Sequence, residues 1–233
     1  MNYLPPLASA PNTKAARIGF LYWAFSFCLL GSLISLITAL VGLPLSSAQL
    51  NFICYSVNFA VAVLIFREFL WENWKTAADR IFPTLYYAIL AYLGSQLFLT
   101  LVNRVILAIR PDFGNVNDES IHAMLAQAPG IMVLGAVVLA PVAEEIFYRG
   151  IFFRKLFDVK PWLGYLASML VFAAVHTVGY IGSVEPALLM LGFLQYLPAG
   201  YCLCWCYRQT GTILSPILMH MLFNASSILS LVR

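Results

Sequence analysis

Long uncharged apolar stretches alternate with short charged segments along nearly the whole chain. A helix needs about 20 apolar residues to cross a bilayer, and most of these stretches reach that length. They run approximately over 18–43, 49–66, 83–107, 131–153, 161–181, 187–207 and 212–232. The pattern predicts an all-α fold, a polytopic transmembrane helical bundle of about seven spans. An eighth is possible if the segment Glu68–Asp79 enters the membrane as a re-entrant element.

Basic residues fall mainly on one side of this predicted topology. With the N-terminus in the cytoplasm, the cytoplasmic segments carry Lys14, Arg17, Arg67, Lys75, Arg80, Arg149, Arg154, Lys155, Lys160 and Arg208. The other side keeps Arg104, Arg110 and Arg233. This bias agrees with the positive-inside rule. We expect 1–110 to form N-terminal transmembrane helices with a cytoplasmic tail, 111–130 an extracytoplasmic loop, and 131–233 a catalytic transmembrane core.

Composition agrees with a membrane protein. Only 10% of the residues are charged and 62% are hydrophobic, whereas soluble domains carry about 25% charged residues. The net charge of +3 follows from the topology and does not suggest a nucleic-acid partner. Among the five cysteines, Cys202, Cys204 and Cys206 alternate. Helical positions i and i+2 lie about 200° apart, so these three are not expected to converge on one metal.

Two adjacent glutamates, Glu144 and Glu145, stand inside the fourth apolar stretch. A carboxylate at bilayer depth costs about 2.5–3.5 kcal/mol, so such residues are candidates for a functional site. Arg149 is four residues after Glu145, the favourable order for a helical ion pair, whereas Glu144 points about 100° away. One carboxylate can therefore be neutralised while the other serves as a base. Pro141 is expected to free the carbonyl of Val137 and to kink the helix.

Two of the three histidines lie within spans. His122 falls in the polar segment, where Asn117 to Ser120 can cap a short surface helix, and we expect it to be solvated. His176 lies in the fifth span, and His220 and Asn224 share one face of the seventh. Each polar residue alone could be an interhelical hydrogen bond worth about 0.6 kcal/mol. Together with the glutamates and arginine, they indicate acid–base chemistry.

These residues resemble the motifs of the CAAX protease and bacteriocin-processing family (CPBP, or Abi). The matching elements are Glu144-Glu145-x-x-x-Arg149, Phe172-x-x-x-His176 and His220-x-x-x-Asn224, in this order within 131–224. The segment 211–216 before His220 is also similar. The resemblance implies a hydrolase, an intramembrane CAAX-type endopeptidase with a four-helix catalytic core. The first 110 residues carry no part of it.

The resemblance implies hydrolysis of a peptide bond in a membrane-associated peptide or protein. Glu144 with His176 would activate a water, His220 and Asn224 would donate to the oxyanion, and Arg149 would hold Glu145. No cofactor is favoured. The alternative is a metalloprotease in which zinc is bound by His176, His220 and Glu144, since two histidines and a glutamate form an acceptable ligand set.

Two other classes of function stay open. A proton-coupled transporter also needs buried ionisable residues, but we see no internal repeat of the kind such carriers show. A catalytically silent membrane scaffold or immunity protein would keep the fold without the chemistry. Compact loops favour a multi-pass protein of a bacterial inner membrane, in contact with the lipid bilayer. Neither the identity of the substrate nor the oligomeric state follows from the residues.

Overall fold

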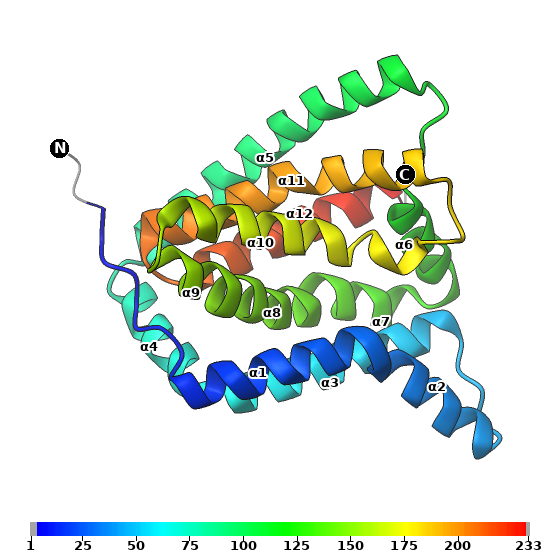
Figure 1. Cartoon of the computed structure of the whole chain (residues 1–233), viewed down its shortest axis with the longest axis horizontal. Helices are drawn as coiled ribbons and strands as arrows, with labels where there is room; N and C mark the ends of the chain where they lie inside the picture. The colour runs from blue at the N-terminus through cyan, green and yellow to red at the C-terminus, as the bar shows by residue number, and fades with distance from the viewer. Residues whose placement is uncertain (1–3, 232–233) are drawn as a thin grey trace.

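The computed structural model describes residues 4–231, which form an all-α bundle (Figure 1). The α-helices are α1 (Thr13–Phe25), α2 (Gly31–Leu40), α3 (Ser47–Ile65), α4 (Arg67–Ala78), α5 (Ile81–Ile109), α6 (Val116–Gln127), α7 (Pro129–Val133), α8 (Ala140–Glu145), α9 (Arg154–Phe157), α10 (Pro161–Val175), α11 (Pro186–Thr210) and α12 (Leu214–Leu231). The π-helical stretches are η1 (Ser26–Leu30), η2 (Leu134–Leu139) and η3 (Ile146–Phe153), and a 3-10 turn, η4, covers Val178–Tyr180.

Six helices in the described part of the chain are long and apolar enough to cross a membrane. They span Thr13–Leu40, Ser47–Ile65, Ile81–Ile109, Pro129–Phe157, Pro161–Tyr180 and Pro186–Thr210. Leu214–Ser230 is a shorter apolar helix and takes the place of the seventh predicted span. Val232, the expected end of that span, and Arg233 lie outside the described residues. The fold is therefore the predicted polytopic bundle of an integral membrane protein.

The span from α7 to α9 runs through the middle of the bundle (Figure 1). On one side α3 packs against η2 and α8, and α1 packs against η3. On the other side α10 packs against η3, while α11 packs against α5, α10 and α12. The largest buried cluster includes Ile146, Phe147, Phe172, Leu203 and Tyr207. The two glutamates therefore lie on the most enclosed helix.

Basic segments gather at the end of the bundle that holds the N-terminus, α4 and α9 (Figure 1). The Arg208 Nη1 atom donates to the carbonyl of Pro5 at 2.8 Å, which ties the N-terminal segment to the end of α11. At the same end the Asn73 side chain of α4 accepts a hydrogen bond from the Ile213 N–H at 2.7 Å. The helix α4 is thus a short element anchored to the α11–α12 turn, and it does not add an eighth span.

The polar segment before α7 forms helix α6 at the opposite end of the bundle (Figure 1). The expected surface helix is present, but its N-cap is Asn115 rather than the residues from Asn117 onward. The Asn115 carboxamide accepts from the N–H groups of Asn117 and Asp118, because the side chain two residues earlier reaches the free amides of the first turn. His122 is exposed on this helix, as predicted.

Candidate active site

The two glutamates close a six-residue α-helix, α8, that lies between the π-helical stretches η2 and η3. In the π pattern the Ala140 N–H donates to the carbonyl of Gly135, five residues back. Pro141 has no N–H, so in this register it leaves the carbonyl of Ala136 free. The Asn224 Nδ2 atom donates to that carbonyl at 2.8 Å. The carbonyl expected from the sequence was instead that of Val137, because α-helical spacing was assumed.

Glu145 is held from two sides. Its Oε1 atom lies 2.9 Å from Nη1 of Arg149 and 2.8 Å from Nδ1 of His220. Glu145 and Arg149 are both 0% exposed at the side chain. Arg149 also donates through Nη2 to the carbonyl of Gly200 at 3.3 Å and lies over the Phe172 ring at 4.8 Å. The i, i+4 ion pair between Glu145 and Arg149 that was expected from the sequence is present, and Oε1 of Glu145 is occupied by Arg149 and His220.

His220 connects the paired glutamate to its neighbour. Because Glu145 bonds the arginine through the same oxygen, it is a carboxylate, so the Nδ1–H of His220 donates to it. The opposite ring nitrogen, Nε2, lies 3.9 Å from Oε2 of Glu144. The ring thus has one nitrogen fixed and the other facing Glu144.

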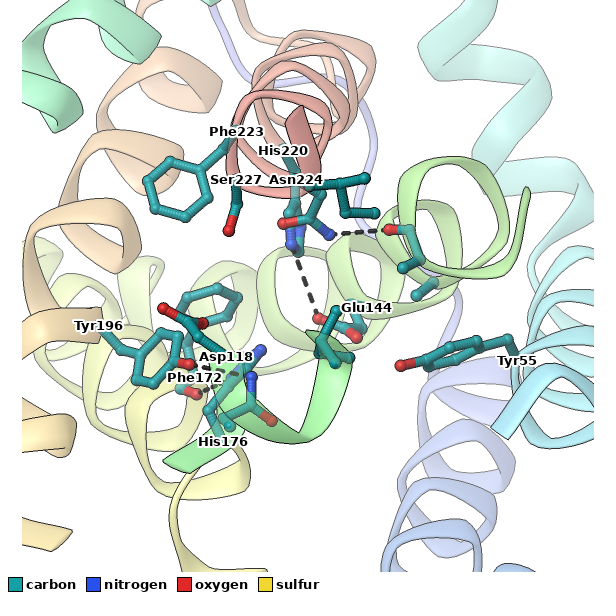
Figure 2. Close-up of a pocket in the computed structure, with 15 residues that line it drawn as sticks. Tyr55, Asp118, Glu144, Phe172, His176, Tyr196, His220, Phe223, Asn224 and Ser227 are labelled. Atoms are coloured by element: carbon teal, nitrogen blue, oxygen red, sulfur yellow. Dashed lines mark hydrogen bonds and ion pairs between the residues drawn. The ribbon is translucent and has the colours of Figure 1, made fainter. Parts of the chain in front are cut away.

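Glu144 differs from Glu145 in both exposure and partners. Its side chain is 24% exposed, and its Oε2 atom is buried without a hydrogen-bond partner in the described part of the chain. Figure 2 shows Glu144 facing the pocket, with the Tyr55 hydroxyl pointing toward it from α3. His176 lines the same pocket, and its Nδ1 lies 2.7 Å from the Phe172 carbonyl. A carbonyl only accepts, so Nδ1 carries the proton and the neutral ring keeps a lone pair on Nε2.

The pocket brings together side chains from α3, α6, α8, α10, α11 and α12 (Figure 2). Its polar lining residues are Tyr55, Asn117, Asp118, Glu144, His176, Tyr196, His220, Asn224 and Ser227. Of the six residues singled out in the sequence, Glu144, His176, His220 and Asn224 line it. Glu145 and Arg149 are not among the lining residues: Glu145 bonds His220, and Arg149 bonds Glu145.

Two larger cavities adjoin this pocket. One, of about 300 Å³, shares Glu144 and His176 and lies toward α1 and α3. The other, of about 310 Å³, shares Asp118, Tyr196 and Ser227 and lies between α5, α11 and α12. The pocket therefore has a cavity on each of two sides.

Several pocket residues were not singled out in the sequence as candidates. Tyr55 comes from a span that carries no motif, and Asp118 comes from the segment expected only to cap a helix. Burial is the main cause that raises the pKa of Asp118 to about 6, with the neighbouring Glu119 adding to it. The signal in the sequence was the acidic pair Asp118 and Glu119, which lies in the first turn of α6, where acidic residues are common in any helix.

The described residues contain no group of three or more histidine, cysteine, aspartate or glutamate side chains placed to hold a metal ion. Of the expected zinc ligands, His220 directs Nδ1 to Glu145 and His176 directs Nδ1 to a backbone carbonyl. Their Nε2 atoms and Glu144 are the groups that would remain for a metal.

Comparison with known proteins adds a family to this geometry. Residues 126–226 match the family described as type II CAAX prenyl endopeptidase Rce1-like. We call residues 126–226, which are similar to this family, the Rce1-like segment. The Rce1-like segment begins at the end of α6 and contains all six residues singled out in the sequence, whereas α1 to α5 lie outside it.

A curated relative supports the family. The UPF0177 protein YbdI of Lactococcus lactis subsp. lactis (strain IL1403) is 30% identical over 88 residues. The aligned region covers 38% of this chain and 42% of that protein, so the chain spans less than half of the relative's length. No solved structure matches.

Proposed function

We propose that this protein is an intramembrane endopeptidase that hydrolyses a peptide bond in a membrane-associated peptide or protein. Water is activated by Glu144 with His176. The observation that carries the proposal is the difference between the two adjacent glutamates. Glu145 is fully buried and bonded to Arg149 and His220, whereas Glu144 faces the pocket with an unpaired oxygen. A general base needs such a free carboxylate beside the reacting water.

In this mechanism a water lies between Glu144 and the lone pair of His176 Nε2. Glu144 takes a proton from the water, and the oxygen of that water attacks the scissile carbonyl carbon. The proton then passes to the leaving nitrogen as the C–N bond breaks, which yields a carboxylic acid and an amine. Asn224 uses one N–H for the Ala136 carbonyl and has a second N–H for the oxyanion.

His220 can assist at the oxyanion only when both ring nitrogens carry protons. Its Nδ1–H is already directed at Glu145, so the donor toward the pocket is Nε2–H. Glu145 Oε1 lies 2.8 Å from Nδ1 and Glu144 Oε2 lies 3.9 Å from Nε2, so a carboxyl group faces each side of the ring. Glu145 therefore supports the oxyanion site through its hydrogen bond with His220.

For its location we propose a bacterial inner membrane with the N-terminus in the cytoplasm. Support comes from one end of the bundle, where the start of α1, α4, α9 and the adjoining turns lie together (Figure 1). This end carries nine of the 13 basic residues: Lys14, Arg17, Arg67, Lys75, Arg80, Arg154, Lys155, Lys160 and Arg208. The active site then lies closer to the extracytoplasmic helix α6.

The test is cleavage of membrane-tethered peptides by the purified full chain in lipid, with and without a strong zinc chelator. Glu144→Gln should abolish cleavage, whereas the matched substitution Glu72→Gln, at an exposed position of α4, should not. Full cleavage by folded Glu144→Gln would refute the mechanism. Loss on chelation with recovery on adding zinc would favour the zinc-dependent form. Rescue of the cellular phenotype by Glu144→Ala would favour a scaffold.

A further inference from the structure

The cavity of about 300 Å³ beside Glu144 and His176 lies between a part of the chain inside the Rce1-like segment and a part outside it. One wall is formed by α8, η3 and α10, within the Rce1-like segment. The opposite wall is formed by α1, η1 and α3, outside that segment. We call this cavity the α3 cleft. Its α3 wall consists of Asn51, Tyr55 and Asn58.

These three residues form one polar strip along α3. Their spacing of i, i+4 and i+7 places them on one face of the helix over two turns. The middle member, Tyr55, directs its hydroxyl toward Glu144 (Figure 2). Asn51 and Asn58 therefore lie about one helical turn on either side of Tyr55, the residue that faces Glu144.

Asn58 offers hydrogen-bond donors to the cleft. Its Oδ1 atom accepts from the Tyr22 hydroxyl at 2.8 Å and from the Ser26 hydroxyl at 2.5 Å. These two donors fix the carboxamide so that oxygen faces α1 and η1. The Nδ2 group has no hydrogen bond to any other residue that the structure describes, and a carboxamide nitrogen carries two N–H donors.

Asn51 has the opposite arrangement. Its Nδ2 group donates to the Ser47 carbonyl at 3.2 Å and contacts the Met124 sulfur at 3.0 Å. Its Oδ1 atom has no partner among the described residues and is an acceptor at the cleft wall. Seven helical residues rise about 10 Å, so the free acceptor of Asn51 and the free donors of Asn58 are about 10 Å apart along the helix.

That separation fits an extended peptide. A strand rises about 3.3 Å per residue, so groups three residues apart are also about 10 Å apart. One peptide N–H could then bond to Asn51 while a peptide carbonyl three residues away bonds to Asn58. The bond between them would lie at the level of Tyr55 and Glu144. When a substrate backbone leaves water for a membrane protein, its N–H and C=O groups need hydrogen-bond partners there.

Four aromatic residues also line the cleft. Trp23 and Phe27 stack with ring centroids 5.9 Å apart, and both line the cleft together with Phe147 and Tyr148. Phe27 is 44% exposed, so its edge of the cleft faces the outside of the bundle, where lipid would be. An aromatic wall of this kind favours a bulky apolar side chain.

We propose that the α3 cleft binds an extended, membrane-tethered polypeptide with a bulky apolar residue beside the scissile bond, and that Asn51 and Asn58 bind its backbone. This assignment rests on the proposed function for its place in catalysis, but binding can be measured without cleavage. Asn51 and Asn58 are substrate-positioning residues, because they act on the peptide backbone away from the reacting atoms.

The test uses the full chain as Glu144→Gln in lipid nanodiscs, with palmitoylated ten-residue peptides as probes. Each peptide carries one benzophenone group for cross-linking and either Phe or Gly at a central position. Cross-links should map to α1 and α3, and the Phe peptide should bind more tightly than the Gly peptide. Asn58→Asp keeps the acceptor for Tyr22 and Ser26 but removes the donors, and it should weaken binding about 2- to 13-fold, the usual range for one hydrogen bond.

Asn51→Leu removes the free acceptor and should weaken binding to a similar extent. The matched control is Asn103→Asp on α5, which keeps its hydrogen bond from Gln195 and lies outside the cleft. A peptide in which one amide is replaced by an ester lacks one N–H. An ester at the position bound by Asn51 should weaken binding to the Glu144→Gln protein but add nothing in the Asn51→Leu variant.

The outcomes separate the two proposals. Cross-links to α5 and α12 instead of α3, or equal binding by Asn58→Asp, Asn51→Leu and the control, would overturn the cleft assignment even if Glu144 is needed for cleavage. Binding that depends on both asparagines would support the cleft even if the protein with Glu144 intact cleaves none of the probes. In that case only the proposed function would fail.

Discussion

Replacing Arg149 by methionine removes a fully buried charge and leaves Glu145 without its arginine partner. At 2.9 Å and an effective dielectric constant of about 20, the pair attracts by about 6 kcal/mol. Part of this is recovered because His220 stays beside Glu145. Breaking one side of a buried pair usually costs about 3–5 kcal/mol, and we expect Arg149→Met to fall in that range.

The double variant Glu145→Gln/Arg149→Met should recover part of this loss. Neither side chain then leaves an uncompensated charge, and replacing both partners of a buried pair is often close to neutral. We expect the double variant to be more stable than the sum of the single losses by about 2 kcal/mol or more. Unfolding in mixed micelles can be followed by the fluorescence of the five tryptophans.

The exposed pair Lys75–Glu72 is a matched control because it has the same separation, 2.9 Å, with side chains 52% and 49% exposed. A cycle of Lys75→Met and Glu72→Gln should give a coupling of about 0–1 kcal/mol. If the buried cycle were additive within about 0.5 kcal/mol, the burial argument for Arg149 would be refuted.

Three further perturbations test separate parts of the structure. An alanine Cβ at Gly135 would lie 2.7 Å from Cδ2 of Tyr55, so Gly135→Ala should displace that ring, cost about 1–3 kcal/mol and slow cleavage tenfold or more. Asn73→Ala leaves the Ile213 N–H buried and unpaired, which should cost about 1–3 kcal/mol in the same unfolding assay. Asp118 has a pKa raised to about 6 by burial, so the folded state binds its proton more tightly than the unfolded state. The free energy of unfolding should fall as the pH rises from about 4 to 6, by about 3 kcal/mol at most. Asp118→Asn should remove that fall.

Each of these has its own control. Gly130→Ala meets no atom within 4 Å and should leave cleavage unchanged, and an equal loss at both glycines would contradict the proposed role of the Tyr55 ring. Ser230→Ala at an exposed position should change stability by less than about 0.5 kcal/mol. For the pH profile, Asp79→Asn at an exposed position should behave as the natural protein. A profile that is the same with and without Asp118 would show that burial does not control this carboxyl group.

The hydrophobic pattern was sufficient for the fold because a bilayer imposes a length on each helix. The pair between Glu145 and Arg149 also followed from spacing alone, since both residues lie on one helix. The contact of His220 with Glu145 did not follow, because it joins helices 75 residues apart in the chain. The hydrogen bond from Asn224 to the Ala136 carbonyl depends on a π-helical register, which the sequence pattern does not predict. The roles of these residues stay predictions.

The α3 wall was missed for a different reason. The wall consists of three uncharged residues, Asn51, Tyr55 and Asn58. Uncharged polar residues within a span often form interhelical hydrogen bonds, so their presence does not by itself indicate a functional site. Their heptad-like spacing was visible, but the same spacing is common in helix packing. Only the partners of each carboxamide distinguish a packing contact from a free donor or acceptor.

The link between Arg208 and Pro5 joins residues 203 positions apart, and it has a consequence for biogenesis. At synthesis rates of about 5–20 residues per second, the ribosome needs about 10–40 s to make the chain between them. His220 emerges later still, on α12. During that interval the earlier helices can enter the membrane, but the pocket lacks its last wall. Under the proposed function, a nascent chain would therefore have no complete hydrolytic centre with which to attack its own unfolded segments or those of its neighbours at the translocon.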